Sequence, residues 1–139
     1  MQNKLILTLL LFSSLFGQTL TIYTGERITI PNNAVNATRV KLNVPDSGTI
    51  TDINLKFSAS HTYDFARTYI GLISPYGTHV TLTNGNGGGS NSSTLSTNIV
   101  DRGTWDDEAS KSMGDVNKPF NDSFRPANPL SAFDGEQMQ

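Results

Sequence analysis

The chain contains no cysteine and few charged residues. Without cysteine it can form no disulfide scaffold, no thiolate metal site and no cysteine nucleophile. Lys and Arg together number 10 and Asp and Glu 12, a formal net charge of −2 that provides no basic surface for nucleic acid or an anionic membrane. At 139 residues the chain has room for one core. We therefore expect a single domain held by packing and hydrogen bonds, with a hard metal ion as the one further source of stability.

Catalytic motifs are also scarce. The chain has two histidines, His61 and His79, and contains neither Gly-x-Ser-x-Gly nor His-Glu-x-x-His. A serine hydrolase needs a nucleophile, a base and a group that orients the base. His79 falls within an apolar-polar alternation on the face opposite Val80 and Leu82, so we expect it to be exposed. His61 follows a strand pattern, and we expect it to make a structural hydrogen bond.

Residues 1–17 predict a secretory signal peptide. Lys4 precedes an apolar run from Leu5 to Phe16 that is broken by three hydroxyl residues, and a glycine follows it. The run is too short and too interrupted for a stable transmembrane helix. Cleavage would release a secreted, extracellular chain that starts at Gln18 and has no membrane span. A buried hydrophobic helix and an uncleaved anchor are the alternatives.

The rest of the chain alternates short β-branched runs with turn residues. Residues 18–43 read as N-terminal strands and a linker, and residues 44–139 as the main domain. In residues 53–57 and 80–82, apolar side chains recur at every second position, the period of a strand with one buried face. SPYGT, residues 74–78, has a proline and a glycine placed to turn a hairpin. With no helical spacing between them, these strands predict an all-β fold, an antiparallel β-sandwich or jelly roll.

Five segments succeed one another in an order that resembles a known family. They are ITDINLKFSASHTYD, IGLISPYGTHVTL, a Gly-rich loop, TWDDEAS, and PF followed by FRPANPLSAFDGE. Across residues 44–136 this succession resembles the P domain, or P/Homo B domain, of proprotein convertases and secreted subtilisin-like proteases. The family has a His-Thr-Tyr/Trp segment, a Leu-Ile-Ser-Pro-x-Gly-Thr hairpin, a Phe-Asp-Asp-Glu-Ala segment and a Pro-Leu-Ser-Ala-Phe-x-Gly-Glu segment.

The resemblance implies a galactose-binding-like jelly roll without catalytic residues. In the family this domain is commonly joined to a subtilisin-like or metalloprotease domain, whose folding and stability it supports. The implied function is therefore a secreted accessory domain of serine endopeptidase proteolysis, with a protease catalytic domain or another extracellular protein as partner. The alternative is a free-standing jelly-roll binding module or adhesin for sugar or protein. Its candidate contact residues are Tyr63, Phe65, Tyr69 and Tyr76.

The acidic run at residues 106–108 follows Trp105, the only tryptophan, and is the candidate site. Because the family usually has phenylalanine at this position, the resemblance implies that the Trp105 ring points into the sandwich. Adjacent carboxylates repel unless donors or a cation offset their charge, and hard oxygen ligands suit calcium. The predicted calcium ligands are Asp106, Asp107 and Glu108, joined by Asp64 and Asp101 if folding brings their segments near. The alternative, which the sequence favours over calcium, is a set of backbone caps, in which each carboxylate accepts N–H bonds in a tight turn.

The C-terminal end departs from the family pattern. The family continues past its Phe-x-Gly-Glu segment through about two further strands, whereas this sequence stops at Gln139. Three explanations are open. The sequence is part of a longer secreted protein, or another copy or partner donates the missing strands, or the N-terminal strands from Thr19 to Ile30 fill the gap.

Overall fold

The chain is an all-β protein, as the sequence predicts. The computed structural model describes residues 3–13, 19–26, 28–30, 38–61, 68–85, 99–112 and 121–138. These ranges are mostly β-strand, with several antiparallel pairs, one short 3-10 helix and no α-helix. Within them, no helix is long and apolar enough to cross a membrane.

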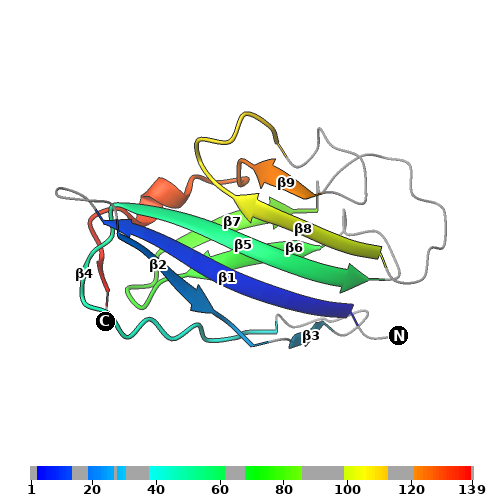
Figure 1. The fold of residues 1–139 in the computed structure, drawn as a ribbon, viewed down its shortest axis with the longest axis horizontal. Helices are drawn as coiled ribbons and strands as arrows, with labels where there is room; N and C mark the ends of the chain where they lie inside the picture. Colours follow the sequence, from blue (N-terminus) through cyan, green and yellow to red (C-terminus); the bar gives the residue numbers. More distant parts are fainter. Residues whose placement is uncertain are drawn as a thin grey trace.

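The larger sheet has the strand order β2-β1-β5-β8-β9, and β3 also pairs with β1 (Figure 1). All of its pairs are antiparallel except β8 with β9, which is parallel. The strands are β1 Asn3–Ser13, β2 Thr19–Thr24, β3 Ile28–Ile30, β5 Asp52–His61, β8 Ile99–Trp105 and β9 Asn121–Phe124. The segment predicted to be a signal peptide supplies β1, between β2 and β5. A strand at these residues does not show whether residues 1–17 are removed, so the signal peptide stays a prediction.

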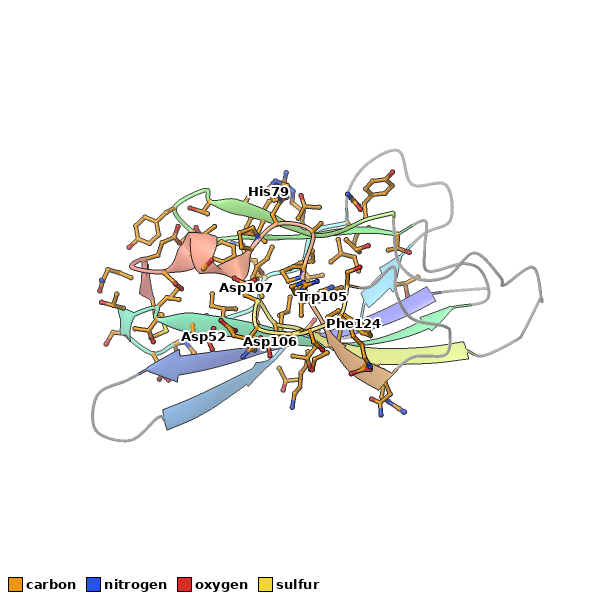
Figure 2. All side chains as sticks on the ribbon, turned by 90° about the horizontal axis from the view of Figure 1, so that it is seen from above. Asp52, His79, Trp105, Asp106, Asp107 and Phe124 are labelled. Carbon is orange, nitrogen blue, oxygen red and sulfur yellow. The ribbon has the colours of Figure 1, made fainter. Side chains whose placement is uncertain are left out.

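A hairpin and a small sheet complete the described structure. β6, Tyr69–Ile73, pairs with β7, His79–Asn84, and β4, Gly48–Thr49, pairs with β10, Gln137–Met138. SPYGT forms the turn between β6 and β7, as predicted, with Gly77 at φ 90°. Ser74 N donates to Thr78 O at 2.9 Å, and Gly77 N donates to Ser74 O at 3.0 Å. Figure 2 shows this hairpin and the larger sheet as two layers, with the core side chains between them.

The core lies between the two layers, around the Trp105 ring. Trp105 is fully buried, and its ring stacks on Phe57 with centroids 4.2 Å apart and an interplanar angle of 22°. Gly103 permits a close approach, because an added Cβ would lie 2.6 Å from Phe57 Cε1 and 2.9 Å from Phe124 Cε2. The buried cluster comprises Ile53, Leu55, Phe57, Val80, Leu82, Trp105, Phe124, Leu130 and Phe133. The predicted alternation in residues 53–57 is confirmed, and Trp105 points inward.

A bulge in β7 alters the predicted alternation of that strand. Ile70 lies opposite Thr83 and Gly71 lies opposite Thr81, so Leu82 is the extra residue. An extra residue shifts the side chains that follow it to the other face. Thr83 is accordingly turned inward and is only 3% exposed, whereas His79, before the bulge, is exposed as predicted.

Residues 38–47 keep the periodicity of a strand without its ladder. Leu42 and Val44 are half-buried and pack against the core, while Lys41 and Asn43 are exposed. The described segment pairs with no strand before β4. An alternation of apolar and polar residues therefore predicts which side chains are buried, but it does not predict that the segment pairs with another strand.

Truncating Trp105 should be among the most damaging single changes in the chain. We expect Trp105→Ala to lower the free energy of unfolding by about 3 to 5 kcal/mol, because it opens a cavity next to Phe57. Trp105→Phe should cost clearly less, because it keeps a stacked ring and because Trp105 Nε1 has no hydrogen-bond partner to lose among the described residues. Guanidinium unfolding of both variants checks this; equal losses would show that the aromatic stack contributes little.

Candidate functional site

The acidic run forms the turn that follows β8. Asp106 N donates to Phe124 O at 3.0 Å, which ties the turn to the end of β9. Glu108 N donates to Asp106 Oδ1 at 2.8 Å, and Ala109 N donates to Asp106 O at 3.2 Å. Asp106 thus folds the turn back on itself in the way that aspartate side chains commonly do.

Asp107 binds a different part of the chain. Leu130 N donates to its Oδ1 and Ser131 N to its Oδ2, both at 2.8 Å. These are the first two amides of η3, the 3-10 helix Leu130–Phe133, and amides at a helix start have no partner within the helix. Pro129, at the N-cap position, makes no side-chain cap. Asp107 therefore caps η3 from a remote turn, and charge-assisted bonds of this type are stronger than neutral ones (Figure 2).

The residues after η3 are bonded to two other parts of the chain. Gly135 N donates to Ile50 O at 2.9 Å, and Ile50 N donates to Glu136 O at 2.8 Å. Glu136 Oε1 accepts a hydrogen bond from Thr78 Oγ1, in the β6–β7 turn. The FDGE segment thus connects the approach to β5 with the SPYGT turn, so that motifs far apart in sequence contact one another.

Negative charge gathers around the acidic turn. Burial raises the pKa of Asp52, and the charges of Asp106, Asp134 and Asp107 raise it further against an opposing backbone hydrogen bond. A hydrogen bond with the Asp106 carboxylate is the main cause that raises the pKa of Glu108. Burial and the Asp107 charge raise the pKa of Asp134. Figure 2 shows Asp52, Asp106 and Asp107 in the same part of the molecule.

Only some of the predicted ligands come together. Asp106, Asp107 and Glu108 share the turn, and the caps predicted as the alternative are present at Asp106 and Asp107. Asp101 is in β8, where it lies opposite Ala59 of β5. It comes four residues before Trp105, so an extended strand places it about 13 Å from the start of the acidic turn. Asp64 lies outside the described residues.

In the described part of the chain, no three His, Asp or Glu side chains are placed to hold a metal ion, and calcium stays a prediction. Asp52 and Asp134 also interact electrostatically with the acidic turn, and the sequence analysis does not predict this. Asp134 stands in the FDGE segment, and Asp52 begins β5; neither neighbours the acidic run in sequence. His61 ends β5, and its hydrogen bonding lies outside the described structure.

No family model matches the chain, and comparisons with curated proteins and with solved structures find no match. The P-domain resemblance therefore stays a prediction from the five ordered segments.

Neutralising Asp107 should cost more than neutralising Asp106. Asp107 accepts from two amides through two oxygens, and an asparagine keeps one acceptor oxygen, so we expect Asp107→Asn to lower the free energy of unfolding by about 1 to 3 kcal/mol. Asp106 accepts the backbone amide of Glu108 through Oδ1, so Asp106→Asn keeps this bond and should stay within about 0.5 kcal/mol of wild type. Urea unfolding of both variants measures the difference. Equal losses would contradict the cap on η3.

The raised pKa values of Asp52, Asp134 and Glu108 predict that these three carboxyls destabilise the fold less as the pH is lowered from neutral. A raised pKa means that the folded state binds the proton more tightly than the unfolded state, so protonation of these carboxyls stabilises the fold. This stabilisation is fully present below the ordinary pKa, which is 3.8 for Asp52 and Asp134 and 4.5 for Glu108. It is lost as the pH rises through the raised pKa values. We expect Asp52→Asn to melt above wild type at pH 7 and the difference to shrink as the pH falls.

Asp122→Asn is the matched control for this pH experiment. Hydrogen bonding to Lys111 lowers the pKa of Asp122, so the same chemical change should lower the melting temperature at pH 7. Melts recorded by circular dichroism from neutral pH downward would show both trends. An Asp52→Asn variant that melts at or below wild type at pH 7 would show that the charge of Asp52 is not under strain.

Proposed function

We propose that the chain is a secreted, non-catalytic jelly-roll domain of the P/Homo B type, which supports the folding and stability of a subtilisin/kexin-like serine endopeptidase. The observation that carries the proposal is the bonding between the segments that resemble the family. TWDDEAS caps PLSAF through Asp107, and FDGE binds the SPYGT turn through Glu136. These motifs are used to hold the fold together, which is the role expected of an accessory domain.

The side chains of these motifs favour structure over chemistry. Trp105 is fully buried, and Leu130 and Phe133 are each 1% exposed. Both oxygens of Asp107 accept backbone amides at 2.8 Å. A general base or nucleophile must reach a substrate, so such residues suit a domain that acts through its partner.

The proposal assigns calcium to the acidic turn in a structural role. Asp107 is engaged with η3, so the oxygens that fit an ion best are those of Asp106 and Glu108, with the Asp52 carboxylate as their neighbour. Flexible oxygen ligands suit calcium, and a bound cation would favour the ionised forms of Asp52 and Glu108, which burial and hydrogen bonding disfavour. The ion would stabilise the end of the sandwich.

Calcium should raise the melting temperature of the full chain relative to chelator, because an ion that binds the folded state stabilises it. A shift equivalent to about 2.7 kcal/mol is expected when calcium is at a hundredfold excess over its dissociation constant. The double variant Asp106→Asn with Glu108→Gln should lose this response, while Asp122→Asn should keep it. A calcium response that persists unchanged in the double variant would place the ion elsewhere.

The protease association can be tested with the tagged full chain as bait in secretions of its native host. We expect a serine protease that reacts with a fluorophosphonate probe to co-purify, and the chain to slow its thermal inactivation at least severalfold. The purified chain itself should not react with the probe. Trp105→Ala, which disrupts the core, is the matched bait control. Recovery of no probe-reactive protein, or an unchanged inactivation rate, would contradict the proposal.

Exposed tyrosines favour a binding module as the second candidate. Tyr69 is 76% exposed and Tyr76 is 52% exposed, at opposite ends of β6 and its turn. Tyr63 and Phe65 lie outside the described residues. Aromatic side chains with a polar end are common at binding surfaces. Glycan-array binding that disappears on Tyr69→Ala, without any protease partner, would favour this candidate over the first.

A further inference from the structure

β6 is an edge strand of the hairpin layer. Within the described residues its hydrogen-bonded neighbour is β7 alone. The far side of β7 is covered, because Ala127 N donates to Leu82 O at 3.0 Å and Asn128 N donates to Thr81 O at 2.9 Å. The described structure therefore closes the β7 edge and leaves β6 as the outer strand.

This edge lacks the usual protection against association. Natural edge strands carry charges, prolines or bulges that discourage pairing with another chain. β6 reads YIGLI and contains no charged residue and no proline. The bulge of the hairpin inserts its extra residue, Leu82, in β7. β6 itself keeps a regular alternation of exposed and half-buried residues over its whole length.

The apolar side chains of β6 are incompletely covered on both faces. On the inner face, Ile70 and Leu72 are only partly buried, although Val80 and Leu82 in the adjacent strand are each 1% exposed. On the outer face, Tyr69 is 76% and Ile73 51% exposed. One more strand beside β6 would cover both sets, since a neighbouring strand extends both faces of a sheet.

The order of residues in β6 matches a second copy of itself. An antiparallel pair centred on Gly71 places Tyr69 opposite Ile73 of the second copy on the outer face. It places Ile70 opposite Leu72 on the inner face and Gly71 opposite Gly71. Every pair then joins apolar or aromatic groups, or two glycines, and no like charges meet. A two-fold interface requires self-complementarity of this kind.

We propose that β6 pairs antiparallel with β6 of a second copy, which joins two β6–β7 hairpins into one four-stranded sheet across a two-fold axis. The inner side chains of the two copies extend one apolar layer, and the outer side chains form two Tyr69–Ile73 pairs. The inference holds whether or not the chain also binds a protease, because β6 contains no residue of the acidic turn or of η3.

The interface is short, so the dimer should be weak. Stable complexes bury about 1,200 to 2,000 Å² in total, and a single five-residue strand pair falls below that range. We expect a dissociation constant of about 0.1 to 1 mM. The dimer should therefore be measured at high protein concentration.

A charge-swap experiment on the full chain tests the dimer and its register. Variant K carries Tyr69→Lys and Ile73→Lys, and variant E carries Tyr69→Glu and Ile73→Glu. In the proposed register each variant opposes like charges in its own dimer, whereas a mixture of the two opposes unlike charges. Val40→Lys is the matched control, since Val40 is an exposed apolar residue outside β6, 44% exposed.

Sedimentation equilibrium at concentrations up to about 1 mM, chosen to match the expected affinity, gives the readout. Wild type and Val40→Lys should rise above the monomer mass of 15.1 kDa. Variants K and E should each stay monomeric, and their equimolar mixture should associate at least tenfold more tightly than either alone. Wild type that remains monomeric, or variants K and E that dimerise like wild type, would overturn the proposal. A mixture that stays monomeric would overturn the register.

A second measurement covers the case in which variant K or E fails to fold. Amide hydrogen exchange of wild type should show that β6 amides exchange more slowly at about 1 mM than at tenfold or greater dilution, because pairing supplies acceptors to the outward amides. The β5 amides should show no such dependence. Exchange in β6 that is independent of concentration would overturn the proposal without any variant.

Discussion

The carboxylate of Asp107 is the contact on which the C-terminal part of the sandwich depends. It satisfies the first two amides of η3, a helix that begins after a proline and has no side-chain cap of its own. η3 places Leu130 and Phe133 in the core. The same turn begins directly after Trp105, whose ring fills the centre of that core. Asp107 thus ties the turn after β8 to the helix that supplies two core side chains, and an unsatisfied helix start in this position would be costly.

Charge repulsion is the cost of this arrangement. Burial is the main cause that raises the pKa of Asp52 and of Asp134, and the charge with which Asp107 holds two amides raises both further. Asp106 folds the turn, and its carboxylate raises the pKa of Glu108 mainly through a hydrogen bond. The carboxylates that cap the turn and η3 therefore lie beside carboxyl groups whose pKa is raised. A calcium ion bound at Asp106 and Glu108, as proposed, would offset the negative charge of these neighbouring carboxylates.

The parts of the structure that depend on local periodicity could be predicted from the sequence. The alternation of Ile53, Leu55 and Phe57 and the Pro-Gly turn after β6 were both correct, because each is encoded within a few residues. The inward turn of Thr83 could not be predicted, since it follows from a bulge that only pairing with β6 defines. Asp52 joined the acidic turn through tertiary folding, and the bonds from Asp107 to η3 span 23 residues. Contacts of that range have no local signal.

Amide hydrogen exchange at Leu130 and Ser131 tests the bonds from Asp107 to η3 most directly. Resolved by NMR in the full chain, both amides should exchange more slowly than amides without a hydrogen-bond partner, because each donates to Asp107. In Asp107→Asn at least one of them should exchange faster by a factor of ten or more, while the amide of Leu55 in β5 follows global stability. Rapid exchange of Leu130 and Ser131 in wild type would contradict the account, because the cap would then be absent in solution.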